Sequence, residues 1–62
     1  MKQPNPTESK AVTIAEADHQ WHVAVEEPGY LPVVRSFTNE QWAWNFAQGQ
    51  RMRLDLSEVT RI

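Results

Sequence analysis

The stretch NEQWAWNFAQG, residues 39–49, decides how this chain of 62 residues folds, because it is the strongest helix signal present. Thr38 and Gln41 have the spacing of a capping box, in which each side chain hydrogen-bonds the backbone amide of the other. Gly49 suits the left-handed position that follows a last helical turn. Together these signals predict a helix over residues 39–48.

Two tryptophans two positions apart cannot share one face of that helix. At about 100° per residue, an apolar arc should face the rest of the domain. Its members are Trp42, Ala43, Phe46 and Ala47. Trp44 falls outside the arc, beside glutamine and glutamate, so it is covered by the protein's own tail or last strand, buried against another chain, or exposed. Tryptophan is enriched at interface hot spots, which makes a partner one of the readings to test.

Alternating β-branched and aromatic residues before the helix predict three strands. Between the second and third, Pro28 and Gly29 have the residue types of a type II turn. The register of this hairpin cannot be read from the sequence, since a slip of one residue reverses both faces. The predicted strands cover AVTIA at residues 11–15, WHVAV at 21–25 and VVRSF at 33–37.

Beyond Gly49, alternation predicts a final strand over residues 51–56. Its apolar side would carry Met52, Leu54 and Leu56, and its polar side Arg51, Arg53 and Asp55. A continued helix would instead bring Arg53 into the apolar arc.

The predicted architecture is therefore α+β: a small antiparallel sheet of three or four strands in β-β-β-α-β order, with one helix packed on one face. Residues 11–62 form one domain, and the polar residues 1–10, with two prolines, form a disordered tail. The predicted core is Trp21, Val23, Val25, Trp42, Phe46 and Leu54.

A chain this short buries only about 60% of the surface that its unfolded form exposes, which makes its stability marginal. Disulfides, a bound metal or association with another chain usually stabilise such a domain. The chain has no cysteine, which excludes disulfides and thiolate metal sites and leaves association. The first ten residues lack the apolar centre of a secretory signal, and no run approaches the roughly 18 apolar residues of a membrane span. We therefore expect a cytoplasmic protein without membrane contact.

The sequence predicts no enzyme, metal or cofactor. His19 and His22 have no third ligand nearby beyond Asp18 or Glu16, whereas zinc requires three or four converging ligands. Two glycines in the whole chain leave no phosphate-binding loop.

The order of aromatic, serine and threonine residues resembles the N-terminal three-strand-plus-helix modules of tyrosine integrases. The matching residues are Trp21, Arg35, Ser36, Phe37, Thr38, Ala43 and Phe46. The resemblance implies a nucleic-acid-binding alternative, which would use Arg35, Arg51 and Arg53, with Tyr30 or Trp44 for base stacking. Unlike those modules, the second predicted strand carries no lysine or arginine, and the net charge is −2, without the basic excess typical of phosphate binders.

The leading hypothesis is a small non-enzymatic interaction or regulatory module. It would bind itself as a homodimer, or an unidentified protein, through Trp44 and the arginine side of the last strand, Arg51 and Arg53. The off-arc tryptophan and the small core both favour association.

Overall fold

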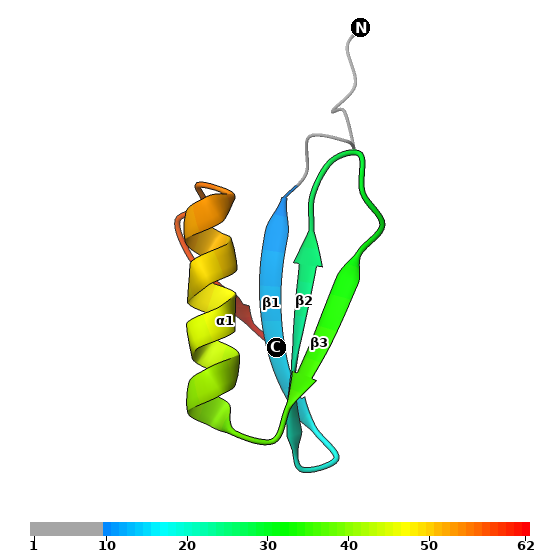
Figure 1. Ribbon diagram of the computed structural model, residues 1–62, viewed down its shortest axis with the longest axis vertical. Helices are drawn as coiled ribbons and strands as arrows, with labels where there is room; N and C mark the ends of the chain where they lie inside the picture. The colour runs from blue at the N-terminus through cyan, green and yellow to red at the C-terminus, as the bar shows by residue number, and fades with distance from the viewer. Residues whose placement is uncertain (1–9) are drawn as a thin grey trace, which may run out of the picture.

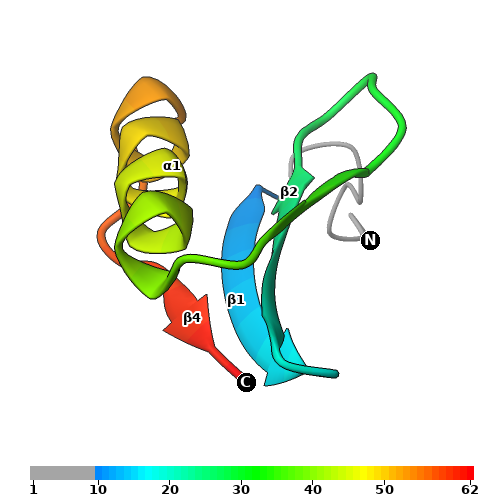
Figure 2. The same cartoon turned by 60° about the horizontal axis from the view of Figure 1, so that its bottom comes forward.

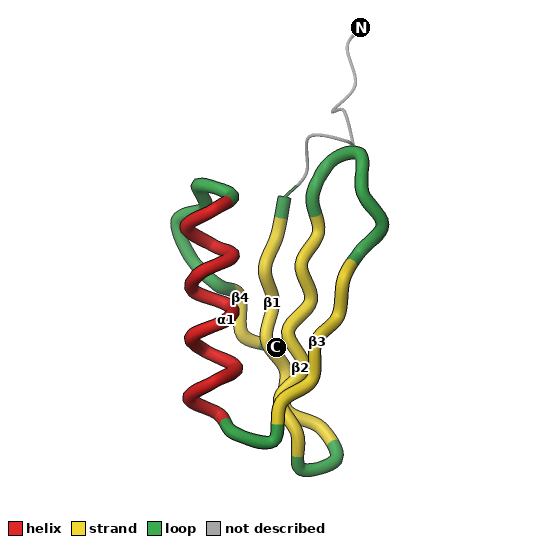
Figure 3. The backbone as a smooth tube through the Cα atoms, viewed as in Figure 1, coloured by secondary structure: helices red, strands yellow, loops and turns green. Residues whose placement is uncertain are grey.

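The computed structural model describes residues 10–62, which form four strands and one helix (Figures 1 and 3). The elements are β1 (Ala11–Ala17), β2 (Gln20–Glu26), β3 (Val33–Phe37), α1 (Glu40–Arg53) and β4 (Thr60–Arg61). The expected α+β fold and its β-β-β-α-β order are confirmed, with the helix against one face of the sheet (Figure 2). The tail expected over residues 1–10 lies outside the described residues, except for Lys10.

The sheet has the strand order β3-β2-β1-β4 and is mixed, not wholly antiparallel. β1 pairs antiparallel with β2, and β2 pairs antiparallel with β3. β4 lies parallel to β1, with Thr60 beside Thr13. The reason is topological: α1 carries the chain back along the sheet, so the strand after it runs in the direction of β3 and hence of β1.

A tight turn lies in each connection between the antiparallel strands. Asp18 and His19 have φ values of 56° and 63°, the left-handed conformation of a two-residue type I′ hairpin turn. Gly29 has φ 81°, and the Tyr30 N–H donates to the Glu27 carbonyl at 3.3 Å, as expected for the predicted type II turn. The resulting register, unreadable from the sequence, puts Val23 opposite Arg35.

The core lies between α1 and the alternate residues of β1 and β2. Three predicted members, Val23, Val25 and Leu54, are buried, and Trp21 and Phe46 pack half-buried against them. The prediction for Trp42 was wrong, because its side chain is 63% exposed. The buried residues are Val12, Ile14, Val23, Val25, Ala43, Ala47 and Leu54.

The alanines, not the tryptophans, set the buried face of the helix. Ala43, Ala47 and the following Leu54 are buried, and small side chains let the helix lie close to the sheet. Around this line Trp44 and Phe46 sit about 80° to either side, whereas Trp42 sits about 120° away. The buried face of the helix is therefore rotated relative to the apolar arc predicted from residues 39–48. Trp44 packs against the core, and Trp42 points outward.

The helix begins one residue later and ends five residues later than predicted. Asn39, not Thr38, is the N-cap, and its side-chain oxygen accepts the Trp42 N–H at 3.0 Å. At the other end Asp55 takes the left-handed conformation, with φ 60°. Its N–H donates to Met52 O at 3.1 Å, and the next N–H, of Leu56, donates to Arg51 O at 2.9 Å. These two bonds make a Schellman motif, so the strand predicted over residues 51–56 was wrong.

Gly49 lies inside α1 and should be improved by alanine. A methyl group there would meet no atom within 4 Å, and Gly49 has no positive φ. We expect Gly49→Ala to raise the free energy of unfolding by about 0.5–1 kcal/mol, since glycine has low helix propensity. Urea denaturation measures the change. A loss of stability would instead indicate that Gly49 ends the helix in its left-handed conformation.

Candidate functional site

Strand β3 is an edge strand with little protection against further pairing. Among residues 10–62 it pairs only with β2, in an unbroken register without a bulge. Val33 and Val34 are both exposed, Val34 by 60%, so the strand presents apolar side chains on both faces. Natural sheets usually protect such an edge with lysine, proline, a bulge or an inward charge. Here only Pro32, just before the strand, and Arg35 within it serve that purpose.

The opposite edge of the sheet is different. β4 has two residues, Thr60 and Arg61, so it offers few backbone groups to another strand. A very short edge strand is one of the usual protections. The contrast singles out β3, the outermost strand on the side away from β4 (Figure 1).

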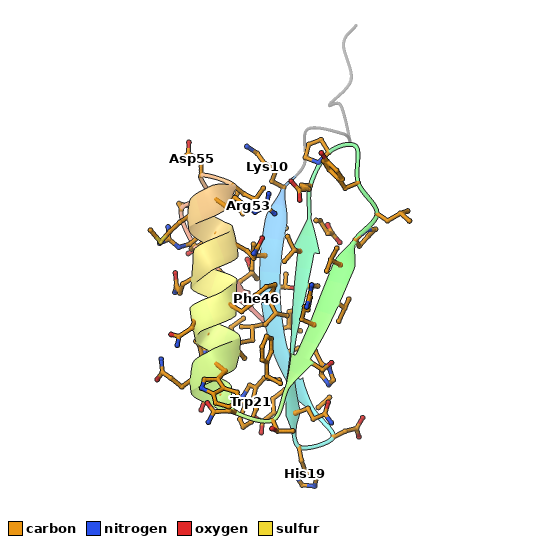
Figure 4. The ribbon with its side chains drawn as sticks, viewed as in Figure 1. Lys10, His19, Trp21, Phe46, Arg53 and Asp55 are labelled. Carbon is orange, nitrogen blue, oxygen red and sulfur yellow. The ribbon has the colours of Figure 1, made fainter. Side chains whose placement is uncertain are left out.

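A shallow groove runs between β3 and α1, because the helix packs mainly over β1 and β2. Its volume is about 140 Å³. Phe46 forms part of its floor, with its ring centroid 5.6 Å from that of Phe37, and lies between helix and sheet in Figure 4. The groove is lined by Val25, Glu27, Val33, Arg35, Phe46, Gln50 and Arg53.

The groove holds three charged side chains, of which two neutralise each other. Arg53 donates from both terminal nitrogens to the Glu27 carboxylate, at 3.3 and 2.9 Å. The hydrogen bond to Glu27 raises the pKa of Arg53 above its ordinary value. Arg35 instead places its guanidinium 5.9 Å from the centroid of Phe46 and forms no salt bridge within the described part of the chain. The groove therefore carries a net positive charge at Arg35.

Exposed aromatic and aliphatic residues extend this surface at both ends. Trp42 precedes Phe46 by four residues and so lies on the same flank of α1. At the other end the loop between β2 and β3 exposes Tyr30 and Leu31. We call the whole region the β3 edge surface: strand β3 with Tyr30, Leu31, Trp42, Phe46 and Arg53.

Two of the residues predicted to bind a partner lie on the other flank of the helix and have contacts within the chain. Trp44 packs against the core, and the Arg61 guanidinium lies 5.9 Å from its ring centroid, so the last strand covers it in part. Arg51 donates to Gln48 Oε1 at 2.7 Å and to the Leu56 carbonyl at 3.0 Å. Arg51 and Arg53 belong to the helix, not to a last strand.

The structure brings Arg35 and Arg53 together in the groove and leaves Tyr30 exposed in the neighbouring loop. Sequence reasoning missed Val34 and Trp42. A signal for Val34 was present, because Val33 and Val34 are apolar on both sides of a strand in which one side should be polar. The outward position of Trp42 follows from the burial of Ala43 and Ala47, which set the buried face of the helix.

The face of the sheet opposite the helix bears on the nucleic-acid alternative. Arg35 and Arg61 pair across strands with Val23 and Ile14, so both project from the helix-covered face. None of the described strand residues on the open face is a lysine or arginine. His22 lies on it, 2.7 Å from Ser36 Oγ through Nδ1 and donating from Nε2 to the Ala17 carbonyl at 3.2 Å. The open face thus lacks the cations that phosphate contacts use.

Within residues 10–62, no group of three or more histidine, aspartate or glutamate side chains is placed to hold a metal ion. Nor does the described part contain a helix long and apolar enough to cross a membrane. The described residues form a small α+β domain in which β3 is an edge strand. No protein-family model, curated protein or solved structure matches the chain.

Proposed function

We propose that this chain is a non-enzymatic interaction module that binds an extended segment of a protein partner as an added strand on β3. The observation that carries the proposal is the weakly protected edge of β3 beside a groove lined in part by Phe46. In such strand addition, main-chain hydrogen bonds supply affinity, and alternate side chains enter neighbouring pockets and supply selectivity.

The side chains along β3 support both halves of that mechanism. Val33 and Arg35 line the groove, so alternate side chains of an added strand would meet them. Val34 lies on the other face and would pack against the residues in between. Trp42 offers a large apolar contact beside the groove, of the kind enriched in binding hot spots.

The proposed function is still the interaction module expected from the sequence, but its binding surface is now the edge of β3. A role for Trp44, Arg51 and Arg53 in partner binding stays a prediction, and of these Arg53 borders the groove. A second copy of the chain is the other candidate occupant of the edge, and solution mass distinguishes it from a foreign segment.

The test is a lysine on the edge strand. Random twelve-residue peptides displayed on phage are panned on the wild-type protein, and the enriched peptides are synthesised and measured by fluorescence anisotropy. Val34→Lys should weaken their binding at least about tenfold, because an exposed lysine on an edge strand discourages further pairing. Val34 is exposed, so the fold should tolerate the change.

Thr60→Lys is the matched control, since it puts the same side chain on the opposite edge strand. Its peptide affinity should equal that of the wild type. Methylation of alternate backbone nitrogens in a bound peptide should also abolish binding, because it removes strand hydrogen bonds. Peptides that bind the wild type and Val34→Lys equally well would show that β3 is not the site.

A further inference from the structure

We infer that the segment added to β3 carries an acidic residue opposite Arg35, with apolar residues two positions before and after it. This inference rests on the proposed function and specifies the partner's chemistry. It follows from the order Val33, Arg35, Phe37 on the groove side of the strand, in which one cation stands between two apolar side chains.

Arg35 is the middle residue of β3 and faces the helix side, because it pairs with buried Val23. A strand added along the free edge would place one side chain directly opposite Arg35, on the same face. The Arg35 side chain is exposed, and its guanidinium lies over Phe46, 5.9 Å from the ring centroid, which places it at the groove. The nitrogen-bearing edge of the guanidinium is then available for a carboxylate, which arginine binds through two parallel hydrogen bonds.

The groove's own acid is already engaged. The Glu27 carboxylate accepts hydrogen bonds from both terminal nitrogens of Arg53, and the Glu27 side chain is only 23% exposed. No other acidic side chain lines the groove. An incoming carboxylate would therefore neutralise Arg35 without competing for Arg53, whereas an incoming lysine or arginine would face an unpaired cation.

The same charge disfavours a second copy of the chain as the occupant. Antiparallel pairing of two β3 strands centred on Arg35 would place the two arginines opposite each other, which is unfavourable. Centring the pair on Val34 would place Val33 opposite Arg35, which supplies no carboxylate. A segment of another protein with a central acidic residue would place a carboxylate opposite Arg35, which neither arrangement of two copies does.

The inference is tested with the same displayed twelve-residue library, panned separately on the wild type and on Arg35→Glu. Wild type should enrich aspartate or glutamate with valine, isoleucine, leucine or an aromatic residue two positions away on each side. Arg35→Glu should enrich lysine or arginine at that position. In a synthesised winner, exchanging the acid for lysine should weaken binding to the wild type about fivefold and strengthen binding to Arg35→Glu by a similar factor.

Two controls separate the causes. Arg61→Glu reverses a charge beside Trp44, away from the groove, and should leave the selected motif unchanged. Arg35→Gln should lose the acidic preference without gaining a basic one, and circular dichroism checks that each variant is folded.

The possible outcomes distinguish failure of this inference from failure of the proposed function. Binding that is lost in Val34→Lys but shows no acidic preference overturns the inference and leaves strand addition standing. Failure to enrich any peptide sensitive to Val34→Lys overturns the proposed function itself. A wild-type dimer that Val34→Lys converts to a monomer makes a second copy the occupant and overturns the inference.

Discussion

Replacing Ile14 by alanine is expected to lower the free energy of unfolding by about 3–4 kcal/mol. Ile14 is 2% exposed and lies on β1, a central strand held between β2 and β4. Truncation removes three carbons' worth of buried contact and leaves a cavity beneath α1, because the rigid sheet cannot collapse around the gap. A domain of this size has only about 3–9 kcal/mol of stability in total, so the substitution should remove a large part of it.

Urea denaturation followed by tryptophan fluorescence measures the effect, and the chain offers a matched control. Ile62→Ala removes the same atoms from a residue that is 78% exposed and whose N–H donates to the Ile14 carbonyl. That substitution should cost less than about 0.5 kcal/mol, since surface changes away from special contacts have small effects. Equal losses in the two variants would contradict the arrangement of the core.

The first three strands were predictable because each carries its own signal. Val12 and Ile14 of β1, and Val23 and Val25 of β2, are buried at alternate positions, and this alternation is visible in the sequence alone. The turn at Pro28 and Gly29 was equally legible, because proline and glycine have fixed roles there. Such local signals predict the structure correctly when the tertiary fold requires the same conformation.

The end of the helix was not predictable from residue type. The left-handed position is filled by Asp55, while Gly49 lies within the helix, so the usual glycine rule indicated the wrong site. A glycine inside a helix costs only about 1 kcal/mol, which the packing of Leu54 below it can offset. β4 is harder still, because two residues show no periodicity and their pairing with β1 depends on where the helix returns the chain.

The candidate site depends on strand order, which no local pattern contains. β3 becomes an edge only because β4 joins the sheet beside β1, at the far side. The Arg53–Glu27 pair, 26 residues apart, forms only once the helix extends over the groove. The arginines were recognised as candidates from the sequence, but their neighbours were not.

Trp44→Ala should destabilise the protein by about 2 kcal/mol, whereas Trp42→Ala should cost less than about 1 kcal/mol. Trp44 packs against the core and under Arg61, while Trp42 is 63% exposed. The two substitutions remove identical atoms from one helix, so each controls for the other in urea denaturation. Acrylamide should likewise quench a component of the fluorescence that Trp42→Phe removes. A larger loss of stability in Trp42→Ala than in Trp44→Ala would indicate that Trp42, and not Trp44, faces the core.

The two tryptophans should also separate stability from binding. Trp42 is exposed on the flank of α1 that bears Phe46 of the groove, so Trp42→Ala should weaken the selected peptides while leaving the fold nearly intact. Loss of stability in Trp44→Ala would not by itself identify an interface, because loss of core packing lowers stability whether or not a partner touches Trp44. If Trp44→Ala, measured under conditions where it is fully folded, lost peptide binding and Trp42→Ala did not, the binding surface would lie on the flank of α1 beside β4 and not beside β3.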